Sequence, residues 1–298
     1  MLVSIKASDQ IEIMNFYILA VWMTLLLTLT GGSNIRCKRN DNEAWSYRGK
    51  RNGPSTWGNT YPDCYHRMQS PINIKYADVK KDSNLKHLQF KNYHECVRSA
   101  EVTNNGHTAK ITPDDGVSRT ICVNGDTYSL DHLHLHWGSG PDAGAEHLFD
   151  NKGYAMEAHF VHINKRGAIA VVGVLYQEAP SNNTGFQPIS EVLCDIKFKG
   201  NTARLRSRLD LSKLLPRLPM QFFRYNGSLT TPGCTEGVIW SVAQNVNRIG
   251  SHQLKELRSL FSVTGNGNRA RRNCHLQDNY RPKQLLSGRK VTLSTCIR

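Results

Sequence analysis

Short runs in which hydrophobic and polar residues alternate dominate the chain from Trp45 onward. These runs are rich in β-branched and aromatic residues and are bounded by clusters of Gly, Asn, Asp and Pro; examples are SPINI (70–74), LDHLHLHW (130–137), AMEAHFVHIN (155–164) and GVIWSVAQNV (237–246). Such patterns are typical of strands joined by turns. Helical periodicity is limited, and its best case is residues 251–261, where one face carries Leu254, Leu257, Leu260 and Phe261. We therefore predict a mainly β (α+β) protein with a few short helices.

An apolar leader precedes the region of alternating runs. Residues 15–30 (NFYILAVWMTLLLTLT) carry no charge and are followed by the small residues GGSN. The stretch is shorter than the roughly 20 residues that a membrane-spanning helix needs, and it suits the core of a secretory signal peptide. Asp9 and Glu12 are untypical of such a signal, so an uncleaved N-terminal anchor is the alternative. We predict a signal peptide over 1–32, a polar arm over 33–44, one domain over 45–294 and a tail over 295–298.

The cysteines agree with export. The chain has eight of them, at positions 37, 64, 96, 122, 194, 234, 274 and 296. None forms a C-x-x-C pair, which argues against a zinc ribbon or a thioredoxin-type redox site, and an even number behind an export signal is typical of disulfides. Two sequons, which begin at Asn182 and Asn226, are candidates for glycosylation in the same compartment. We predict a secreted, extracellular protein.

The charge balance indicates which partners to expect. The chain has 38 Lys and Arg against 24 Asp and Glu. A basic excess favours anionic partners such as an acidic or mineral-associated matrix, polyanionic sugars or lipid headgroups. Nucleic acid is not predicted, because no basic-aromatic motif or dense basic block accompanies the charge. The alternative is that the charge is spread over a solvated face.

Three histidines at every second position stand out in residues 130–140 (LDHLHLHWGSG). Side chains at i, i+2 and i+4 of a strand share a face, so His132, His134 and His136 are predicted to point one way. In the segment 155–164, Glu157 and His159 also share a face, and Glu157 is placed to accept a ring N–H of that histidine. Two histidines from one strand and a third from a neighbour would bind zinc and leave a fourth position open. The spacing alone leaves two ligand pairs open, 132 with 134 or 134 with 136.

Further motifs follow in an order that is typical of one family. H-x-H-W-G is present at 134–138, E-x-H at 157–159 with 22 residues between His136 and His159, and S-L-T-T-P at 228–232. N-G-H is found at 105–107, Q-S-P-I at 69–72, A-E-H in place of S-E-H at 145–147, and D-N-Y-R-P in place of D-N-W-R-P at 278–282. From about Trp45 to about Ser294 the chain resembles the α-class carbonic anhydrases. The resemblance implies a single domain around a large twisted, mostly antiparallel central sheet with a few short surface helices.

The same resemblance implies an activity and its metal ligands. The ligands of Zn²⁺ would be His134, His136 and His159, and the reaction would be the reversible hydration of carbon dioxide to bicarbonate and a proton. His132 stands where the family usually has a glutamine that hydrogen-bonds the first ligand, and a neutral imidazole can accept the same bond. Asn279 is also expected to lie directly behind the ligands. The alternative is a catalytically silent member that acts as a matrix or binding protein, although silent relatives typically lack one or more of these histidines.

Roles around the metal also follow from the resemblance. Thr230 would accept the hydrogen of the attacking hydroxide, Glu146 would accept the proton of the Thr230 hydroxyl, and Thr231 would lie at the substrate site. An apolar wall would receive carbon dioxide, and it would consist of Val161, Val171, Leu229, Val238 and Trp240.

The resemblance further implies a proton path and a disulfide. His107 would carry the proton to buffer, and Tyr47 and Asn105 would hold the connecting waters. Cys64 and Cys234 match the disulfide of the extracellular members of the family. The other six cysteines are left unassigned.

Overall fold

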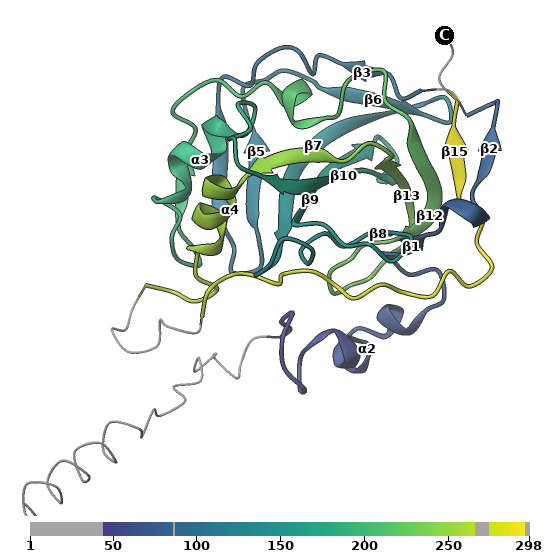
Figure 1. The fold of residues 1–298 in the computed structure, drawn as a ribbon, viewed down its shortest axis with the longest axis horizontal. Coiled ribbons are helices and arrows are strands. Elements are labelled where there is room, and N and C mark those ends of the chain that lie inside the picture. The colour runs from purple at the N-terminus through teal and green to yellow at the C-terminus, as the bar shows by residue number, and fades with distance from the viewer. Residues whose placement is uncertain (1–43, 86, 266–273, 296–298) are drawn as a thin grey trace, which may run out of the picture.

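A large twisted sheet forms the frame of the protein (Figure 1). The computed structural model describes residues 44–85, 87–265 and 274–295. The predicted signal peptide, the polar arm up to residue 43 and residues 296–298 of the tail lie outside these residues. In the described part of the chain, no helix has the length and apolar character needed to cross a membrane.

The large sheet contains thirteen strands, and a separate pair, β1 (Asn73–Ile74) and β8 (Leu148–Phe149), lies beside it. Its strands are β2 (Lys80–Asp82), β3 (Phe90–Lys91), β4 (Ala100–Asn104), β5 (Ala109–Pro113), β6 (Thr120–Val123), β7 (Asp126–Trp137), β9 (Met156–Asn164), β10 (Ile169–Ala179), β11 (Thr202–Arg204), β12 (Phe222–Ser228), β13 (Glu236–Ala243), β14 (Asn247–Gly250) and β15 (Thr292–Ser294). The spatial order is β11-β4-β5-β7-β9-β10-β13-β12-β15-β2, with β14 paired to β10 and β3 joined through β6 to β7.

Most neighbouring strands run antiparallel, as predicted. Parallel pairing occurs where β10 meets β13 and β14, and where β15 meets β2. The longest strands, β7, β9 and β10, lie side by side at the centre of the order. The expected fold class, a single mainly β domain around a large twisted sheet, is therefore confirmed.

The helices are short and few, which also agrees with the prediction. They are α2 (Trp57–Thr60), α3 (Gln187–Leu193) and α4 (Ser251–Arg258), with 3₁₀ turns η1 (Pro54–Thr56), η2 (Pro62–Tyr65), η3 (Tyr76–Asp78) and η4 (Leu211–Leu214). The helix predicted over 251–261 is α4, and it ends three residues earlier than the periodicity suggested. The chain leaves the helix because Phe261 donates its backbone N–H to Lys197 O and forms a bridge with His275.

The two faces of the central strands are buried in different surroundings. On β7, Leu133, Leu135 and Trp137 belong to the main hydrophobic core, together with apolar side chains of α3 and α4. The histidines of β7 alternate with these residues and occupy the opposite face. A second, smaller core of apolar residues lies on that face. The alternation read from the sequence therefore separates a structural face, covered by helices, from a face that carries the chemical groups.

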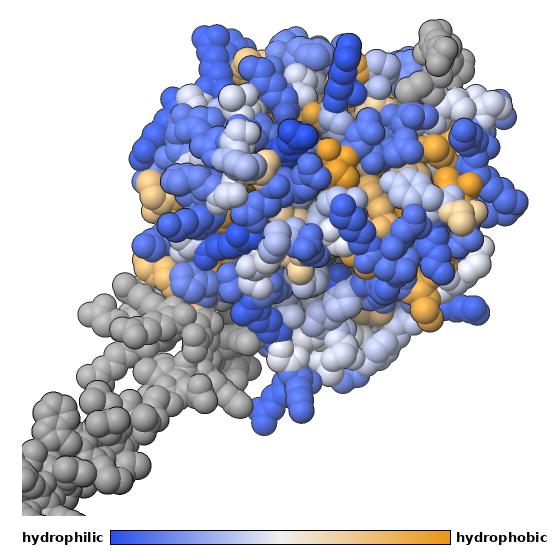
Figure 2. Space-filling view, in the orientation of Figure 1, coloured by the Kyte–Doolittle hydropathy of each residue, from blue (hydrophilic) through white to orange (hydrophobic). Residues whose placement is uncertain are grey.

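Polar side chains cover most of the outer surface. Figure 2 shows one face, on which hydrophilic side chains predominate and hydrophobic ones are scattered between them. Few large hydrophobic side chains are exposed in the described residues, namely Tyr65, Met68, Tyr76 and Leu285. The face in view is therefore largely polar.

A buried ion pair joins the loop between β5 and β6 to its surroundings. Arg119 donates two hydrogen bonds to Asp115, at 2.8 and 2.9 Å, and both side chains are almost fully buried. The hydrogen bonds from Arg119 hold the pKa of Asp115 well below its usual range. A carboxylate with a depressed pKa stabilises the fold above its unfolded pKa, near 4, and loses that contribution as the pH falls.

Asp115→Asn is expected to lower the free energy of unfolding at pH 7 by about 3 kcal/mol, because it leaves a buried guanidinium uncompensated. The loss should shrink at pH 2–3, because the unfolded wild-type chain binds a proton at Asp115 below about pH 4, whereas the folded chain keeps this carboxylate ionised. Urea unfolding at pH 7 and pH 3 measures both effects. Asp114→Asn is the matched control, since Asp114 pairs with Arg204 on the exposed surface and such pairs contribute at most about 1 kcal/mol. Equal losses in the two variants would contradict the prediction.

Candidate metal centre

Two neighbouring strands bring three histidines together. His134 and His136 lie on β7, His159 lies on β9, and His134 is directly opposite His159 in the antiparallel register. One ring nitrogen of each histidine lies within 4.8 Å of those of the other two. The proximity of these ring nitrogens favours the pair 134 and 136 over the other possibility left by the sequence, and it leaves His132 outside the group.

The proton of His136 can be assigned from its partner. Nδ1 lies 2.7 Å from the backbone carbonyl oxygen of Asn279, which can only accept, so Nδ1 carries the proton. Nε2 is then unprotonated, and it is buried without a hydrogen-bond partner among the described residues. The Asn279 side chain holds this arrangement in place, because its Oδ1 accepts the backbone N–H of Trp137 and its Nδ2 donates to Leu135 O. An orphaned lone pair in a buried site indicates a missing cationic partner.

His159 is assigned in the same way. Its Nε2 lies 2.9 Å from Glu157 Oε1, so this nitrogen donates to the carboxylate and Nδ1 is left with a lone pair. Nδ1 lies 3.3 Å from His134 Nε2, on the other strand. Burial lowers the pKa of His134 and of His159, and lowers that of His136 to about 4. The three rings are therefore neutral at pH 7, which is the state that binds a metal.

Glu157 is the buried acceptor that holds His159 from behind. Its Oε1 accepts from His147 Nδ1 at 2.8 Å as well as from His159, and its Oε2 accepts the backbone N–H groups of Glu146 and His147 at 2.9 and 2.8 Å. Burial alone would raise the pKa of Glu157, but the charges and hydrogen bonds of His147 and His159 outweigh burial and hold it well below its usual range. The carboxylate is thus ionised with four donors, and its geometry is fixed from both sides.

A second group of potential ligands, His147, Glu157 and His159, does not suit a metal as well. Both nitrogens of His147 are already engaged, with Glu157 Oε1 at 2.8 Å and with the Tyr225 hydroxyl at 2.7 Å. The group of His134, His136 and His159 differs because its inward nitrogens face one another with no acceptor between them. Three neutral imidazoles are a donor set that suits zinc, with room for a fourth, exchangeable ligand.

Comparison with known proteins agrees with this geometry. A family profile described as eukaryotic-type carbonic anhydrase matches residues 52–295. The chain belongs to the carbonic anhydrase family. Carbonic anhydrase 7 and carbonic anhydrase 1 of Mus musculus are each 34% identical over 265 residues, which cover 84% of this chain and 97% and 98% of theirs. Carbonic anhydrase 15 of Mus musculus is 34% identical over 262 residues, covering 81% of this chain and 80% of its own.

In this carbonic anhydrase, His132 lies directly behind the first histidine of the group. Its Nε2 is 3.0 Å from His134 Nδ1, and its Nδ1 is 2.6 Å from Asp131 Oδ2. Burial lowers the pKa of His132 against the opposing effect of Asp131, so the ring is neutral near pH 7. Asp131 is a site residue that the sequence reasoning missed. In a strictly alternating strand, the Asp131 side chain would lie on the face opposite to His132. A β-bulge in β7 brings the two side chains to the same face.

Glu146 lies on the other side of the histidine group. Its Oε1 accepts the backbone N–H of Arg281 at 2.7 Å, and burial raises its pKa to about 7. Its Oε2 finds no hydrogen-bond partner in the part of the chain that the structure describes. The Thr230 hydroxyl is close enough to lower the pKa of this carboxyl group and is a candidate donor to that oxygen. Thr231 follows in the turn that closes with a hydrogen bond from Cys234 N to Thr231 O.

The five predicted wall residues gather on the histidine face. Val161, Val171, Val238 and Trp240 belong to the smaller core, and Leu229 packs against it. Three of them are neighbours across adjacent strands, since Val171 lies opposite Val161 on one side and opposite Trp240 on the other. The Trp240 ring also contacts His159 edge-on, with 4.8 Å between ring centroids. An apolar wall therefore adjoins the candidate metal position.

His107 lies at the edge of the site, on the turn between β4 and β5. Its ring stacks on Trp45 with 3.8 Å between centroids, and Tyr47 meets both the His107 and His136 rings edge-on at 6.4 Å. Tyr47 thus lies between the surface histidine and the buried one. Asn105 is exposed, and its Oδ1 accepts the backbone N–H groups of His107 and Thr108, which fixes the turn.

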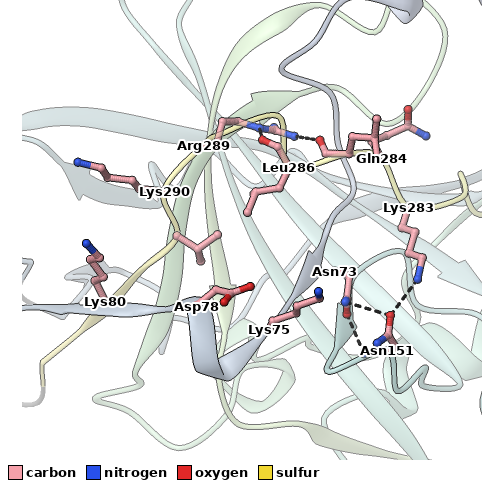
Figure 3. A pocket seen from close by; sticks show the side chains of 12 residues that line it. Asn73, Lys75, Asp78, Lys80, Asn151, Lys283, Gln284, Leu286, Arg289 and Lys290 are labelled. Carbon is pink, nitrogen blue, oxygen red and sulfur yellow. Dashed lines mark hydrogen bonds between the residues drawn. The ribbon is translucent and has the colours of Figure 1, made fainter.

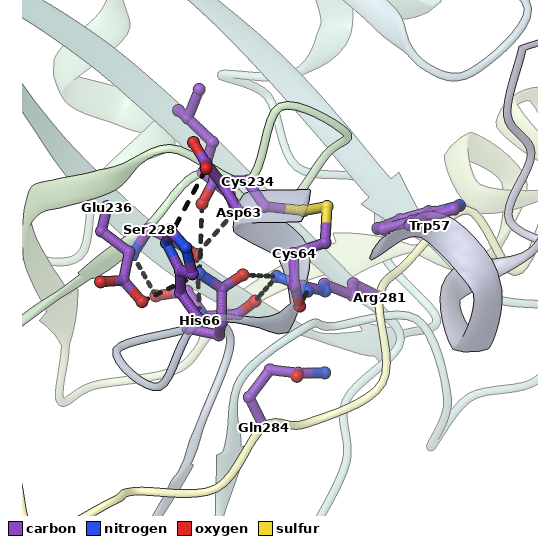
Figure 4. Close-up of a disulfide and its surroundings, with 12 residues drawn as sticks. Trp57, Asp63, Cys64, His66, Ser228, Cys234, Glu236, Arg281 and Gln284 are labelled. Carbon is purple, nitrogen blue, oxygen red and sulfur yellow. Dashed lines mark hydrogen bonds and ion pairs between the residues drawn. A yellow bond between two sulfur atoms is a disulfide. The ribbon is translucent and has the colours of Figure 1, made fainter. Parts of the chain in front are cut away.

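A disulfide between Cys64 and Cys234 ties the N-terminal segment to the Thr230 turn (Figure 4). Arg281 crosses beneath it and donates to Cys64 O, Ser70 O and Gln69 Oε1. Of the other cysteines, Cys274 is also disulfide-bonded, and Cys37 and Cys296 lie outside the described residues. The even number of cysteines does not mean that all of them pair, because Cys96, Cys122 and Cys194 are free thiols in separate parts of the fold.

Proposed function

We propose that this protein is a zinc-dependent enzyme that hydrates carbon dioxide reversibly to bicarbonate and a proton. The observation that carries the proposal is the convergence of the inward nitrogens of His134, His136 and His159. For His136 and His159, the outer nitrogen faces an acceptor, which leaves the inward nitrogen with a lone pair. When bound, zinc lowers the pKa of a water molecule to about 7, a general property of carbonic anhydrases, so that hydroxide is available at neutral pH.

The surrounding residues are assigned the roles that membership of the family implies, and their positions are compatible with these roles. Thr230 would orient the nucleophile through its hydroxyl, which Glu146 would hold by accepting its proton. The wall of Val161, Val171, Leu229, Val238 and Trp240 would receive carbon dioxide, which is small and apolar and needs no hydrogen bonds, with Thr231 at its edge. His107 would carry the released proton to buffer past Tyr47 and Asn105, since an imidazole titrates in the right range.

The second candidate is a silent member of the family that binds or builds matrix without turnover. The geometry favours the active enzyme, because all three histidines are present and their outer nitrogens are occupied by protein acceptors. A silent site has no need for buried lone pairs that face one another, and these are costly without a cation. One experiment separates the two candidates.

Purified protein is expected to contain stoichiometric zinc and to hydrate carbon dioxide in stopped-flow assays, to lose activity on chelation and to recover it when zinc is restored. Thr230→Val should lower kcat/KM by roughly 10–100-fold with zinc content unchanged, because it removes one hydrogen bond to a charged group. Thr127→Val, on the exposed start of β7, is the matched control and should be neutral. Zinc-loaded protein without hydration activity would establish the silent alternative.

We also propose that the protein acts outside the cell. The disulfide between Cys64 and Cys234 is of a kind that persists in oxidising compartments, and the apolar residues 15–30, outside the described part, suit a signal. The sequon residues Asn182 and Asn226 are both exposed, as glycosylation requires. Expression in secreting cells, followed by a mobility shift on enzymatic deglycosylation, tests both points.

A basic groove gives this extracellular enzyme a place to hold an acidic matrix, which we propose as its partner. The groove has a volume of about 640 Å³ and lies between η3, β2 and the segment before β15 (Figure 3). One acidic side chain, Asp78, lines it together with five basic ones, which are Lys75, Lys80, Lys283, Arg289 and Lys290. Lysines 75, 80 and 290 are exposed, so they are accessible to a sulfated or carboxylated polymer.

Replacing Lys75, Lys80 and Lys290 together with glutamine is expected to weaken binding to a sulfated polysaccharide about 10-fold, from three exposed ion pairs at roughly 0.5 kcal/mol each. Elution from an immobilised sulfated polysaccharide would then need less salt. The control removes three exposed lysines elsewhere, at positions 91, 165 and 255, so that the net charge is the same. Equal weakening in both triple variants would show that net charge, and not the groove, holds the polymer.

A further inference from the structure

We propose that Asp131 is a positioning residue for the metal centre, and that it acts through His132 to fix which nitrogen of His134 is free to bind zinc. The inference rests on the proposed metal site and adds a residue to it. Three side chains form a hydrogen-bonded line. Asp131 Oδ2 lies 2.6 Å from His132 Nδ1, and His132 Nε2 lies 3.0 Å from His134 Nδ1.

The direction of the hydrogen bonds follows from the end of the line. His136 and His159 rest on groups that can only accept, a carbonyl and a carboxylate, so their proton positions are fixed. His134 differs because its outer partner is another imidazole, which can donate or accept at Nε2. A carboxylate beside His132 Nδ1 removes this ambiguity. His132 must donate from Nδ1 to Asp131, accept at Nε2 from His134 Nδ1, and so leave His134 Nε2 unprotonated.

A β-bulge makes the contact geometrically feasible. Successive side chains on a regular strand point to opposite faces, so neighbours 131 and 132 should not meet. The β7–β9 register shifts between Leu130 and His132, where two steps along β7 match one step along β9, from His162 to Val161. Asp131 is the extra residue. Bulges re-aim side chains and are common next to active sites, and here the bulge brings the Asp131 carboxylate to the histidine face.

The position of Asp131 agrees with a role of this kind. Its side chain is 49% exposed and makes no other ion pair among the described residues, whereas His132 is only 18% exposed and is enclosed between Asp131 and His134. Lys110, on β5, lies opposite His134 in the β5–β7 register, so a positive charge adjoins the line from the side. The carboxylate of Asp131 is the anionic group at the outer end of this line.

The test is a double-mutant cycle read by zinc affinity, measured by competition with a chromophoric chelator. Asp131→Ala is expected to weaken zinc binding about 10-fold, at the low end of the effect of outer hydrogen-bond partners of metal ligands. In a His132→Ala background the same change should cost less than about 2-fold, because the line is already broken. Asp126→Ala is the control of equal charge, since Asp126 lies on the same strand and pairs with Arg166 at the surface.

A spectroscopic readout completes the test. In the zinc-free protein, ¹⁵N NMR of the histidine rings should show His134 protonated at Nδ1, and Asp131→Ala should introduce the Nε2-protonated form. Equal zinc losses in both backgrounds would mean that Asp131 acts by charge across space, and no loss in either would mean that it has no role; both overturn the proposal. Wild-type protein that binds no zinc at all would instead refute the proposed function.

Discussion

His159→Gln is expected to abolish stoichiometric zinc binding and to lower carbon dioxide hydration by more than about 1,000-fold. The substitution removes the one inward nitrogen that β9 supplies, and two histidines on β7 cannot complete the set that zinc prefers. Without the metal, water near neutral pH loses its acidity and hydroxide becomes scarce. Metal analysis and stopped-flow hydration on the same preparation measure the two losses together.

The control for this variant lies three residues further along the same strand. His162 is as buried as His159, but it faces the main core, where its Nε2 contacts the Tyr93 hydroxyl at 2.5 Å. His162→Gln should therefore keep zinc and activity while lowering the free energy of unfolding by about 1–2 kcal/mol. If both variants lost zinc equally, the loss would reflect disruption of β9 and would say nothing about a ligand.

The faces of the central strands could be predicted from the sequence, whereas the pairing between strands could not. Alternation in 132–137 and 156–162 correctly separated the apolar side chains of the main core from Glu157 and the three grouped histidines. Alternation left two ligand pairs open, because residues 132 and 134 have the same spacing as residues 134 and 136. The local pattern of a strand also does not say how β7 is aligned against β9. The fold brings the ring nitrogens of His134, His136 and His159 together, and that is a tertiary observation.

Two residues near the histidine group show why other parts of the site could not be predicted from the sequence. Asp131 was missed because a bulge breaks the alternation on which the reasoning depended. His147 was quoted only as part of a motif, but the fold makes it a second donor to Glu157 and connects it to Tyr225, 78 residues away. Contacts between segments so distant in the sequence leave no local signal. The free thiols at 96, 122 and 194 are a similar case, since a cysteine count cannot say which side chains meet.

The surroundings of Glu157 are packed so closely that even the backbone opposite it is constrained. Gly173, on β10, lies opposite His159, and a Cβ atom there would come within 2.8 Å of Glu157 Oε1. The carboxylate therefore occupies space that a side chain would otherwise fill. Its four donors approach from two backbone amides and two imidazoles, so no oxygen lone pair is left to accommodate a donor that points the wrong way.

Glu157→Gln is expected to lower the free energy of unfolding of the zinc-free protein by about 2–6 kcal/mol and to weaken zinc binding by roughly 10–100-fold. The amide has nearly the same shape, so no cavity forms; the loss arises because its NH₂ group must face two N–H donors, at about 1–3 kcal/mol each. Urea unfolding without zinc isolates the first effect, and chelator competition the second. Glu101→Gln, at an exposed position of β4, is the matched control and should change neither quantity. Unchanged stability together with unchanged zinc affinity would show that the charge of Glu157 is dispensable, and that His159 is held by packing against Trp240 instead.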